Sequence, residues 1–390
     1  MVAGWAVAAL AAVLAAVPPD GAAEPAATDY DRERAVLAQR LGELEAAASD
    51  PAADATAAAR LAVQRFRYAT LSGDLAELRA AEEAIERALA ALGPVPDLVL
   101  LRAQLHTALH RLPAARQDLA RLPDPADPRA RALAADLDLQ EGRYRAARRG
   151  YTEVLRRERS WDHLARLAFL AAKTGDAAGA ERLYAEAQEQ LTTKEMRPYA
   201  WLELQRGVLD LERGDAAAAL GRFERADRAY SGYWLIEEHL AEALHLLGRT
   251  DEAAARYRRV VARAPRPELL SALAGVLAPS DPGAAAALDA EAARRFDAQY
   301  ALYPEAAVGH LVEHRLRRGE ADARLLALAE ANHRLRPGAE AKLLLARVHL
   351  ALGQRAPARS LIDAILSTPW QTPELDRLAR ETRAPQARGR

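Results

Sequence analysis

Cysteine is absent from this 390-residue chain, and aromatic residues make up only 5% of it. Without cysteine there is no disulfide framework, no cysteine-ligated zinc site, no thiol nucleophile and no lipid-modified cysteine anchor. The scarcity of aromatic and β-branched residues argues against a sheet-rich fold, because such residues favour strands. What remains is a hydrophobic content of 51%, mostly alanine and leucine, which favours close-packed helices.

The chain also lacks a strong charge of either sign. Its formal net charge is -1 and no long basic block occurs, so we expect no nucleic-acid partner. Arginine is used almost throughout in place of lysine, a bias typical of GC-rich bacterial genomes. At this length the chain exceeds a single compact core and is expected to be multidomain or repetitive.

Charged residues are missing from the first 17 positions, "MVAGWAVAALAAVLAAV". This apolar run is short for a bilayer span, and the small residues of "DGAA" follow it, which is typical of a cleaved secretory signal. We therefore predict a signal peptide at 1–23, removed on export to the periplasm. The alternatives are an uncleaved inner-membrane anchor at 1–17, the only membrane contact we expect, or an apolar N-terminal helix.

Helix-ending glycines recur at a nearly fixed distance along the chain. The intervals between them are 33, 39, 34, 71 and 34 residues, of which the fourth is about two periods. A period in this range indicates a repeated pair of helices. The glycines are Gly142, Gly175, Gly214, Gly248, Gly319 and Gly353, and Gly73 lies about two periods before the first of them.

Each unit has further features in common. A small residue follows the glycine, with a larger one four positions later, so that two helices can approach closely while the larger side chain fills the space beside them. The pairs are Ala147/Tyr151, Ala180/Tyr184, Ala219/Phe223, Ala253/Tyr257 and Ala358/Ile362. We expect Asp176, Asp215, Thr250 and Asp322 to cap second helices, and Pro265 and Pro337 to end them.

On these residues the chain resembles the tetratricopeptide repeat family. One unit carries Leu240-Ala241, Gly248, Ala253, Tyr257 and Pro265, and another carries Gly207, Gly214, Ala219, Phe223 and Ala226. The resemblance implies an all-α, right-handed solenoid in which each antiparallel helix pair touches only the adjacent pairs. We count about nine pairs, starting near Ala57, Val95, Pro128, Trp161, Ala200, Trp234, Glu268, Glu305 and Ala339.

The expected organisation follows from this count. Residues 24–56 form a linker and a capping helix whose apolar side carries Val36, Leu37, Leu41 and Leu44, and 57–369 form the array. Residues 370–390 supply a second capping helix, at 373–383, and a tail. At 266–304 the pattern departs from the family, because "PSDPG" replaces the tight turn and a long helix continues to about Tyr300, which leaves the groove geometry there undefined.

The resemblance places the first helix of each pair on a concave wall, and helical spacing then selects its inward positions. This surface is expected to hold a protein or peptide segment. The candidate partner-binding residues are Phe169, Lys173, Trp201, Leu204, Val208, Glu238, Glu242, His245, Glu313 and Arg317. The competing interpretation of Glu238, Glu242 and His245 is an ordinary solvated helix face.

The string "HLVEH" at His310 to His314 matches the inverted zinc-peptidase motif, in which two histidines bind zinc and a glutamate activates water. The third ligand that such a site needs is not recognisable, so two ordinary helix-face histidines are favoured. Other catalytic signatures, including phosphate loops and serine triads, are missing too.

The leading hypothesis is therefore a non-catalytic scaffold of the bacterial cell envelope that uses no cofactor. The alternatives are a divalent-metal-handling protein using its His and Glu patches, and a zinc metallopeptidase at the "HLVEH" string. The sequence does not define the partner or the oligomeric state.

Overall fold

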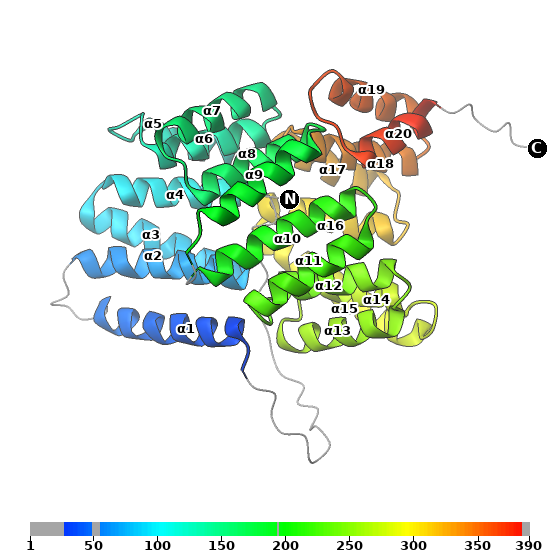
Figure 1. Ribbon diagram of the computed structural model, residues 1–390, viewed down its shortest axis with the longest axis horizontal. Helices are drawn as coiled ribbons and strands as arrows, with labels where there is room; N and C mark the ends of the chain where they lie inside the picture. The colour runs from blue at the N-terminus through cyan, green and yellow to red at the C-terminus, as the bar shows by residue number, and fades with distance from the viewer. Residues whose placement is uncertain (1–26, 49–54, 193–194, 384–390) are drawn as a thin grey trace, which may run out of the picture.

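The protein is all-α in the computed structural model, which describes residues 27–48, 55–192 and 195–383 (Figure 1). Within these ranges there are 20 α-helices and no strand, with one isolated β-bridge between Thr174 and Gln371. The predicted signal peptide lies outside the described residues. The first eleven helices are α1 (Asp29–Ala48), α2 (Ala55–Ser72), α3 (Leu75–Leu92), α4 (Pro96–Ala108), α5 (Leu112–Ala120), α6 (Pro128–Gln140), α7 (Tyr144–Arg157), α8 (Trp161–Lys173), α9 (Ala177–Glu189), α10 (Met196–Glu212) and α11 (Ala216–Ala229).

The remaining helices continue the same alternation. They are α12 (Trp234–Leu246), α13 (Thr250–Arg263), α14 (Pro267–Leu277), α15 (Pro282–Leu302), α16 (Pro304–Arg317), α17 (Ala323–Leu335), α18 (Ala339–Ala351), α19 (Arg355–Leu366) and α20 (Pro373–Arg383). From α2 to α19 they pack two by two, and we number these pairs 1 (α2/α3) to 9 (α18/α19). The predicted all-α solenoid of about nine helix pairs is thus confirmed, as is the long helix of pair 7.

The turn inside most pairs ends on a glycine, as the repeat pattern predicted. Gly73, Gly142, Gly175, Gly214, Gly248, Gly319 and Gly353 all have φ between 65° and 81°, which only glycine adopts without strain. The predicted caps are confirmed at Asp176, Asp215 and Asp322, whose carboxylates accept from backbone N–H groups of the next helix. The cap predicted at Thr250 is wrong, because α13 begins with this residue and Arg249 takes the capping position without a side-chain bond.

The small and large residues of each pair form the core between helices. All five predicted pairs, from Ala147/Tyr151 to Ala358/Ile362, are buried. In pair 5 the absence of a side chain at Gly207 is essential, because an added Cβ would lie 2.3 Å from the Phe223 ring. The sequence pattern therefore marks real packing between the two helices of a pair.

The array is covered at each end by a single helix. Leu41 of α1 is buried, and Leu37 packs against the hydrophobic cluster that includes Tyr30 of α1 and Leu71 of α2. Val36 was expected on the same apolar side, but its side chain is 64% exposed, so this part of the prediction is wrong. One turn of α-helix separates Leu37 from Leu41, whereas Val36 is rotated by about 100° from Leu37. At the other end α20 buries Leu375 and Leu378.

The expectation that each pair touches only its neighbours is also wrong. The chain winds back on itself, so that α18 to α20 lie beside α7 to α9 (Figure 1). The turn inside pair 1 contacts the loop after pair 6, pair 2 contacts the loop after pair 7, and pairs 3 and 4 follow the same rule. Each turn thus lies beside the loop eleven helices later, so one superhelical turn takes five and a half pairs, and we call this line of contacts the inter-turn seam.

The inter-turn seam includes five hydrogen bonds between residues 193 to 202 positions apart. They are Asp29 N–H to Ser231 Oγ at 3.1 Å, Arg266 Nη1 to the Gly73 carbonyl at 3.0 Å, Arg111 Nε to Glu305 Oε1 at 2.5 Å, Ala339 N–H to the Tyr144 hydroxyl at 2.6 Å, and Gln371 N–H to the Lys173 carbonyl at 2.8 Å. Solenoid repeats usually contact only adjacent repeats, so this seam adds long-range contacts that the repeat pattern does not contain.

Candidate functional site

A groove of about 700 Å³ runs along the concave face of the first superhelical turn. Its walls come from the first helices of successive pairs, α2, α4, α6, α8 and α10, together with the start of α12. The volume is within the usual range of binding sites. The helix arrangement that the resemblance implied, with first helices on the concave wall, is present in this part of the array.

Aromatic side chains supply much of the apolar lining. Trp161 and Trp201, at or near the start of α8 and α10, meet edge to face with ring centroids 6.1 Å apart. Tyr233 lines the groove before α12, where it also contacts Tyr30 of α1 with centroids 5.5 Å apart. Half-buried aromatic residues provide large contact areas at a low cost in side-chain entropy, so this wall is suited to an apolar anchor of a bound segment.

A fixed polar network lies at the base of the groove. Arg166 of α8 donates to Asp136 at 3.2 Å and to Asp162 at 2.8 Å, and Asp136 also accepts from the Tyr151 hydroxyl at 2.8 Å. Although burial opposes it, the two carboxylates raise the pKa of Arg166, and burial raises the pKa of Tyr151. Arg166 thus bridges the two carboxylates, and the network holds α6, α7 and α8 in register.

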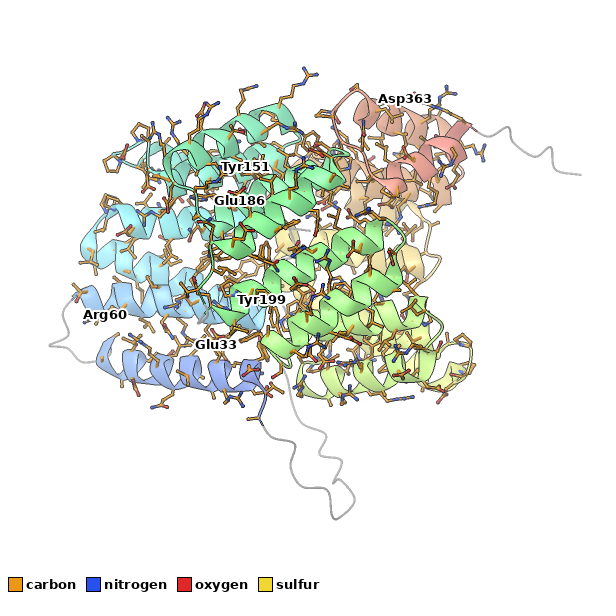
Figure 2. All side chains as sticks on the ribbon, viewed as in Figure 1. Glu33, Arg60, Tyr151, Glu186, Tyr199 and Asp363 are labelled. Atoms are coloured by element: carbon orange, nitrogen blue, oxygen red, sulfur yellow. The ribbon has the colours of Figure 1, made fainter. Side chains whose placement is uncertain are left out.

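The remaining charge at the groove is positive. Arg129 and Arg197 are paired with acids, Arg197 with Glu33 of α1 at 3.1 Å. Arg67 of α2 is exposed, and its guanidinium makes no hydrogen bond or ion pair with any other described residue. Figure 2 places Glu33 on α1, with Tyr199 labelled on α10. Arg67, Trp161 and Trp201 thus line the same groove, and the Arg67 guanidinium has no partner among the described residues.

His163 is a further polar group at the groove. It is buried, and its Nδ1 has no hydrogen-bond partner among the described residues, although Asp162 Oδ2 lies 3.5 Å away. A ligand group that reached this nitrogen would remove the cost of leaving it unsatisfied.

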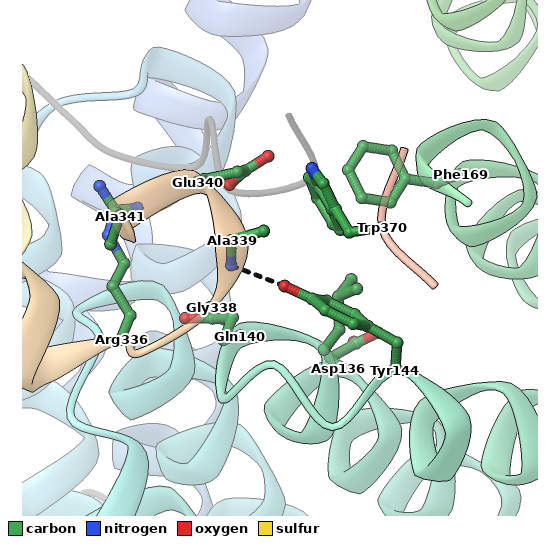
Figure 3. A pocket seen from close by; sticks show the side chains of 11 residues that line it. Asp136, Gln140, Tyr144, Phe169, Arg336, Gly338, Ala339, Glu340, Ala341 and Trp370 are labelled. Atoms are coloured by element: carbon green, nitrogen blue, oxygen red, sulfur yellow. Dashed lines mark hydrogen bonds between the residues drawn. The ribbon is translucent and has the colours of Figure 1, made fainter. Parts of the chain in front are cut away.

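The structure distributes the sequence-predicted residues over several environments. Trp201 lines the groove, and Phe169 lines a second, smaller pocket of about 50 Å³ beside Trp370 (Figure 3). Lys173 is buried and paired with Glu212. Leu204 is fully buried in the core of pairs 5 and 6, and Val208 packs against that core, so both serve packing between helices.

The predicted acidic and histidine-bearing patch does not reach the groove. Glu238 is half-buried, and burial raises its pKa, while Glu242 and His245 are exposed. Glu242 accepts from His239, which is buried in α12 and stacks on Phe223. Glu313 and Arg317 are exposed on α16. These residues therefore lie apart from Trp201 and do not form one surface with it.

Phe66, Arg67, Trp161 and Arg166 were missed by the sequence reasoning. Two of them lie in pair 1, where the repeat pattern is weak. The recurrence of tryptophan at the start of two successive first helices is the signal that marks this wall.

The "HLVEH" string does not form a metal site. His314 is buried against Phe296, with Ser271 Oγ 3.2 Å from its Nδ1, and burial lowers its pKa, whereas Glu313 is exposed. Across the described ranges no group of three or more His, Asp or Glu side chains is placed to hold a metal ion. The metal-handling and metallopeptidase alternatives gain no support from this geometry. None of the described helices has the length and apolar character needed to cross a membrane.

Comparison with known proteins places the chain beside other helical-repeat structures. No family model matches it, and no match was found among curated proteins. Similar solved structures include the Cut9–Hcn1 hetero-tetramer of the APC/C, at 11% identity and a TM-score of 0.48 over 91% of this chain and 63% of that chain. Others are the human IFIT1 dimer with PPP-AAAA, at 12% and 0.45 over 86% and 94%, and yeast Tom70, at 12% and 0.35 over 90% and 96%.

These likenesses are too distant to carry an argument about function, and the chain spans less than two thirds of the first of these structures. The assignment depends instead on the molecule itself: nine helix pairs, turn glycines with positive φ, and small and large residues buried at fixed spacing between the helices. By these features the chain has an α-helical repeat fold, a solenoid of antiparallel helix pairs like that expected of tetratricopeptide repeats.

Proposed function

We propose that this protein is a non-catalytic scaffold of the bacterial cell envelope that holds an extended segment of a partner protein in the first-turn groove. The observation that carries the proposal is the wall formed by Trp161 and Trp201 at the mouth of a groove of about 700 Å³. An apolar side chain of the partner inserts beside these rings, and an acidic group of the partner pairs with Arg67.

A scaffold role agrees with the chemistry of the groove. Its carboxylates, Asp136 and Asp162, are already engaged by Arg166, and no serine or cysteine is present among the described residues that line the groove. Binding therefore uses side chains that stay chemically unchanged, which is what a partner-holding surface requires.

The test is selection of a random peptide-display library on the immobilised protein. We expect enriched peptides to carry an apolar residue near an acidic one, and to lose about tenfold or more in affinity for a Trp161→Ala/Trp201→Ala variant. A Glu242→Ala/His245→Ala variant, altered at exposed positions outside the groove, should bind them like wild type. Absence of any enrichment, or equal binding by the two variants, would reject the groove as the binding surface.

The envelope location depends on residues 1–23, which lie outside the described part of the chain. We propose that they are removed on export. Mass spectrometry of the protein recovered from the periplasm of an expressing bacterium is expected to show a chain that starts near Ala23. Recovery of the full-length chain in the membrane fraction would instead favour the anchor.

A further inference from the structure

The inter-turn seam uses the turns of pairs 1 to 4, four of the nine. The turns of pairs 1, 3 and 4 are covered, because Cβ atoms added at Gly73, Gly142 and Gly175 would each meet a second-turn residue within 3.4 Å. The turns of pairs 5, 6, 8 and 9 are open. Over the described ranges no atom would lie within 4 Å of a Cβ added at Gly214, Gly248, Gly319 or Gly353. We call this second set the open turn edge.

A complementary row of loops is open on the first turn. The seam joins the turn of each pair to the loop that follows the fifth pair after it, as the turn of pair 1 is joined to the loop after pair 6. The loops after pairs 1, 2 and 3, at 93–95, 121–127 and 158–160, make no backbone hydrogen bond to another superhelical turn among the described residues. We call them the open loop edge. The open turn edge and the open loop edge contain the same two kinds of element that meet in the seam, and they lie at opposite ends of one molecule.

The capping helices at the two ends of the array fit the same alternation of first and second helices. Each capping helix is half of a pair: α20 follows the loop after pair 9 in the place of a first helix, and α1 precedes pair 1 in the place of a second helix. Together, α20 of one copy and α1 of the next make a tenth pair. A second copy placed after α20 therefore continues the alternation of first and second helices without a change of register.

Exposed apolar residues of two copies would meet if the second copy continued the array in this way. In a continued array the turn of pair 6 meets the loop after pair 1 of the next copy. Leu246 and Leu247, at the turn of pair 6, are 60% and 39% exposed, and Val95, in the loop after pair 1, is 38% exposed. Only seven large apolar side chains are this exposed among the described residues, and the register of the seam brings three of them together.

We propose that the open turn edge of one molecule binds the open loop edge of a second copy, head to tail, and thereby extends the superhelix. The contact is heterologous, because each copy contributes a different edge, so each bound copy leaves one edge of each kind free. It continues the intramolecular seam with the same elements, with Leu246, Leu247 and Val95 at its centre. The proposal is independent of what the groove binds.

The test uses two edge variants, Leu246→Asp/Leu247→Asp and Val95→Asp, in sedimentation velocity at up to about 200 μM. Wild type is expected to show a mass that increases with concentration, and each variant alone should remain a monomer. A mixture of the two variants should form a one-to-one complex and nothing larger, because one intact edge of each kind remains.

Ala290→Asp, an exposed position within α15, is the matched control and should assemble like wild type. Circular dichroism melting of each variant verifies folding. Three results would overturn the proposal: wild type that stays monomeric throughout, a wild-type dimer that both edge variants still form, or variants that do not combine.

Discussion

At the scale of single residues, His110 shows how the seam overrides the repeat pattern. It occupies the turn of pair 2, where other pairs have glycine, and it is the one described residue other than glycine with a positive φ, 57°. Its Nδ1 lies 2.9 Å from Gln140 Oε1, and Arg336 Nη1 lies 3.2 Å from its Nε2. Burial, together with the positive charge of Arg336, lowers the pKa of His110 to about 3.

This lowered pKa predicts a pH dependence of stability. Unfolded His110 takes up a proton near pH 6.5, whereas the folded protein resists protonation of this ring until about pH 3. Stability should therefore fall as pH decreases from 6.5, by up to about 1.4 kcal/mol per pH unit from this residue. Asn tolerates a positive φ, so His110→Asn should fold with a shallower decline. Urea unfolding between pH 4.5 and 7 measures both slopes, and identical slopes would contradict the assignment.

At the scale of helices and loops, the sequence predicted what is local. The helix pairs, their turn glycines and the Ala/aromatic spacing repeat within about 34 residues, so they leave a visible period, and the pair starts could be placed from it. Helical spacing within one pair likewise selected Trp201, which lines the groove. The seam and most of the groove lining were not predicted, because they join residues such as Arg266 and Gly73, which are 193 positions apart and share no pattern.

A glycine comparison tests the seam at this scale. Gly338 has φ -72° and ψ 178°, which alanine adopts readily, but an added Cβ would lie 2.8 Å from the Gln140 carbonyl oxygen. Gly338→Ala should therefore destabilise the protein by about 1–3 kcal/mol. Gly275→Ala in α14 meets nothing within 4 Å among the described residues and should stabilise it by about 0.5–1 kcal/mol. Urea denaturation compares the two, and a stabilising Gly338→Ala would mean that the loop and turn do not touch.

At the scale of the whole molecule, the seam changes how a solenoid behaves. Repeats that touch only their neighbours unfold by sections, since their stability is a sum of local terms. Here Arg266 donates to the Ser72 and Gly73 carbonyls and lies 3.7 Å from the centre of the Trp234 ring. Unfolding of one superhelical turn therefore exposes buried groups of the other superhelical turn. The groove is shaped by helices that this contact holds in place, which links the fold of the second turn to binding in the first.

The most direct measurement of this closure is a cross-link across the seam. Thr174 and Gln371 are paired by a parallel bridge, and the chain has no cysteine, so Thr174→Cys/Gln371→Cys introduces the only possible disulfide. Gln354 lies at the other end of α19, about 18 Å further along, so Thr174→Cys/Gln354→Cys is the control. Mild oxidation followed by non-reducing gel electrophoresis and mass spectrometry should show a complete intramolecular cross-link in the first variant and none in the second. An open spiral would leave both variants reduced.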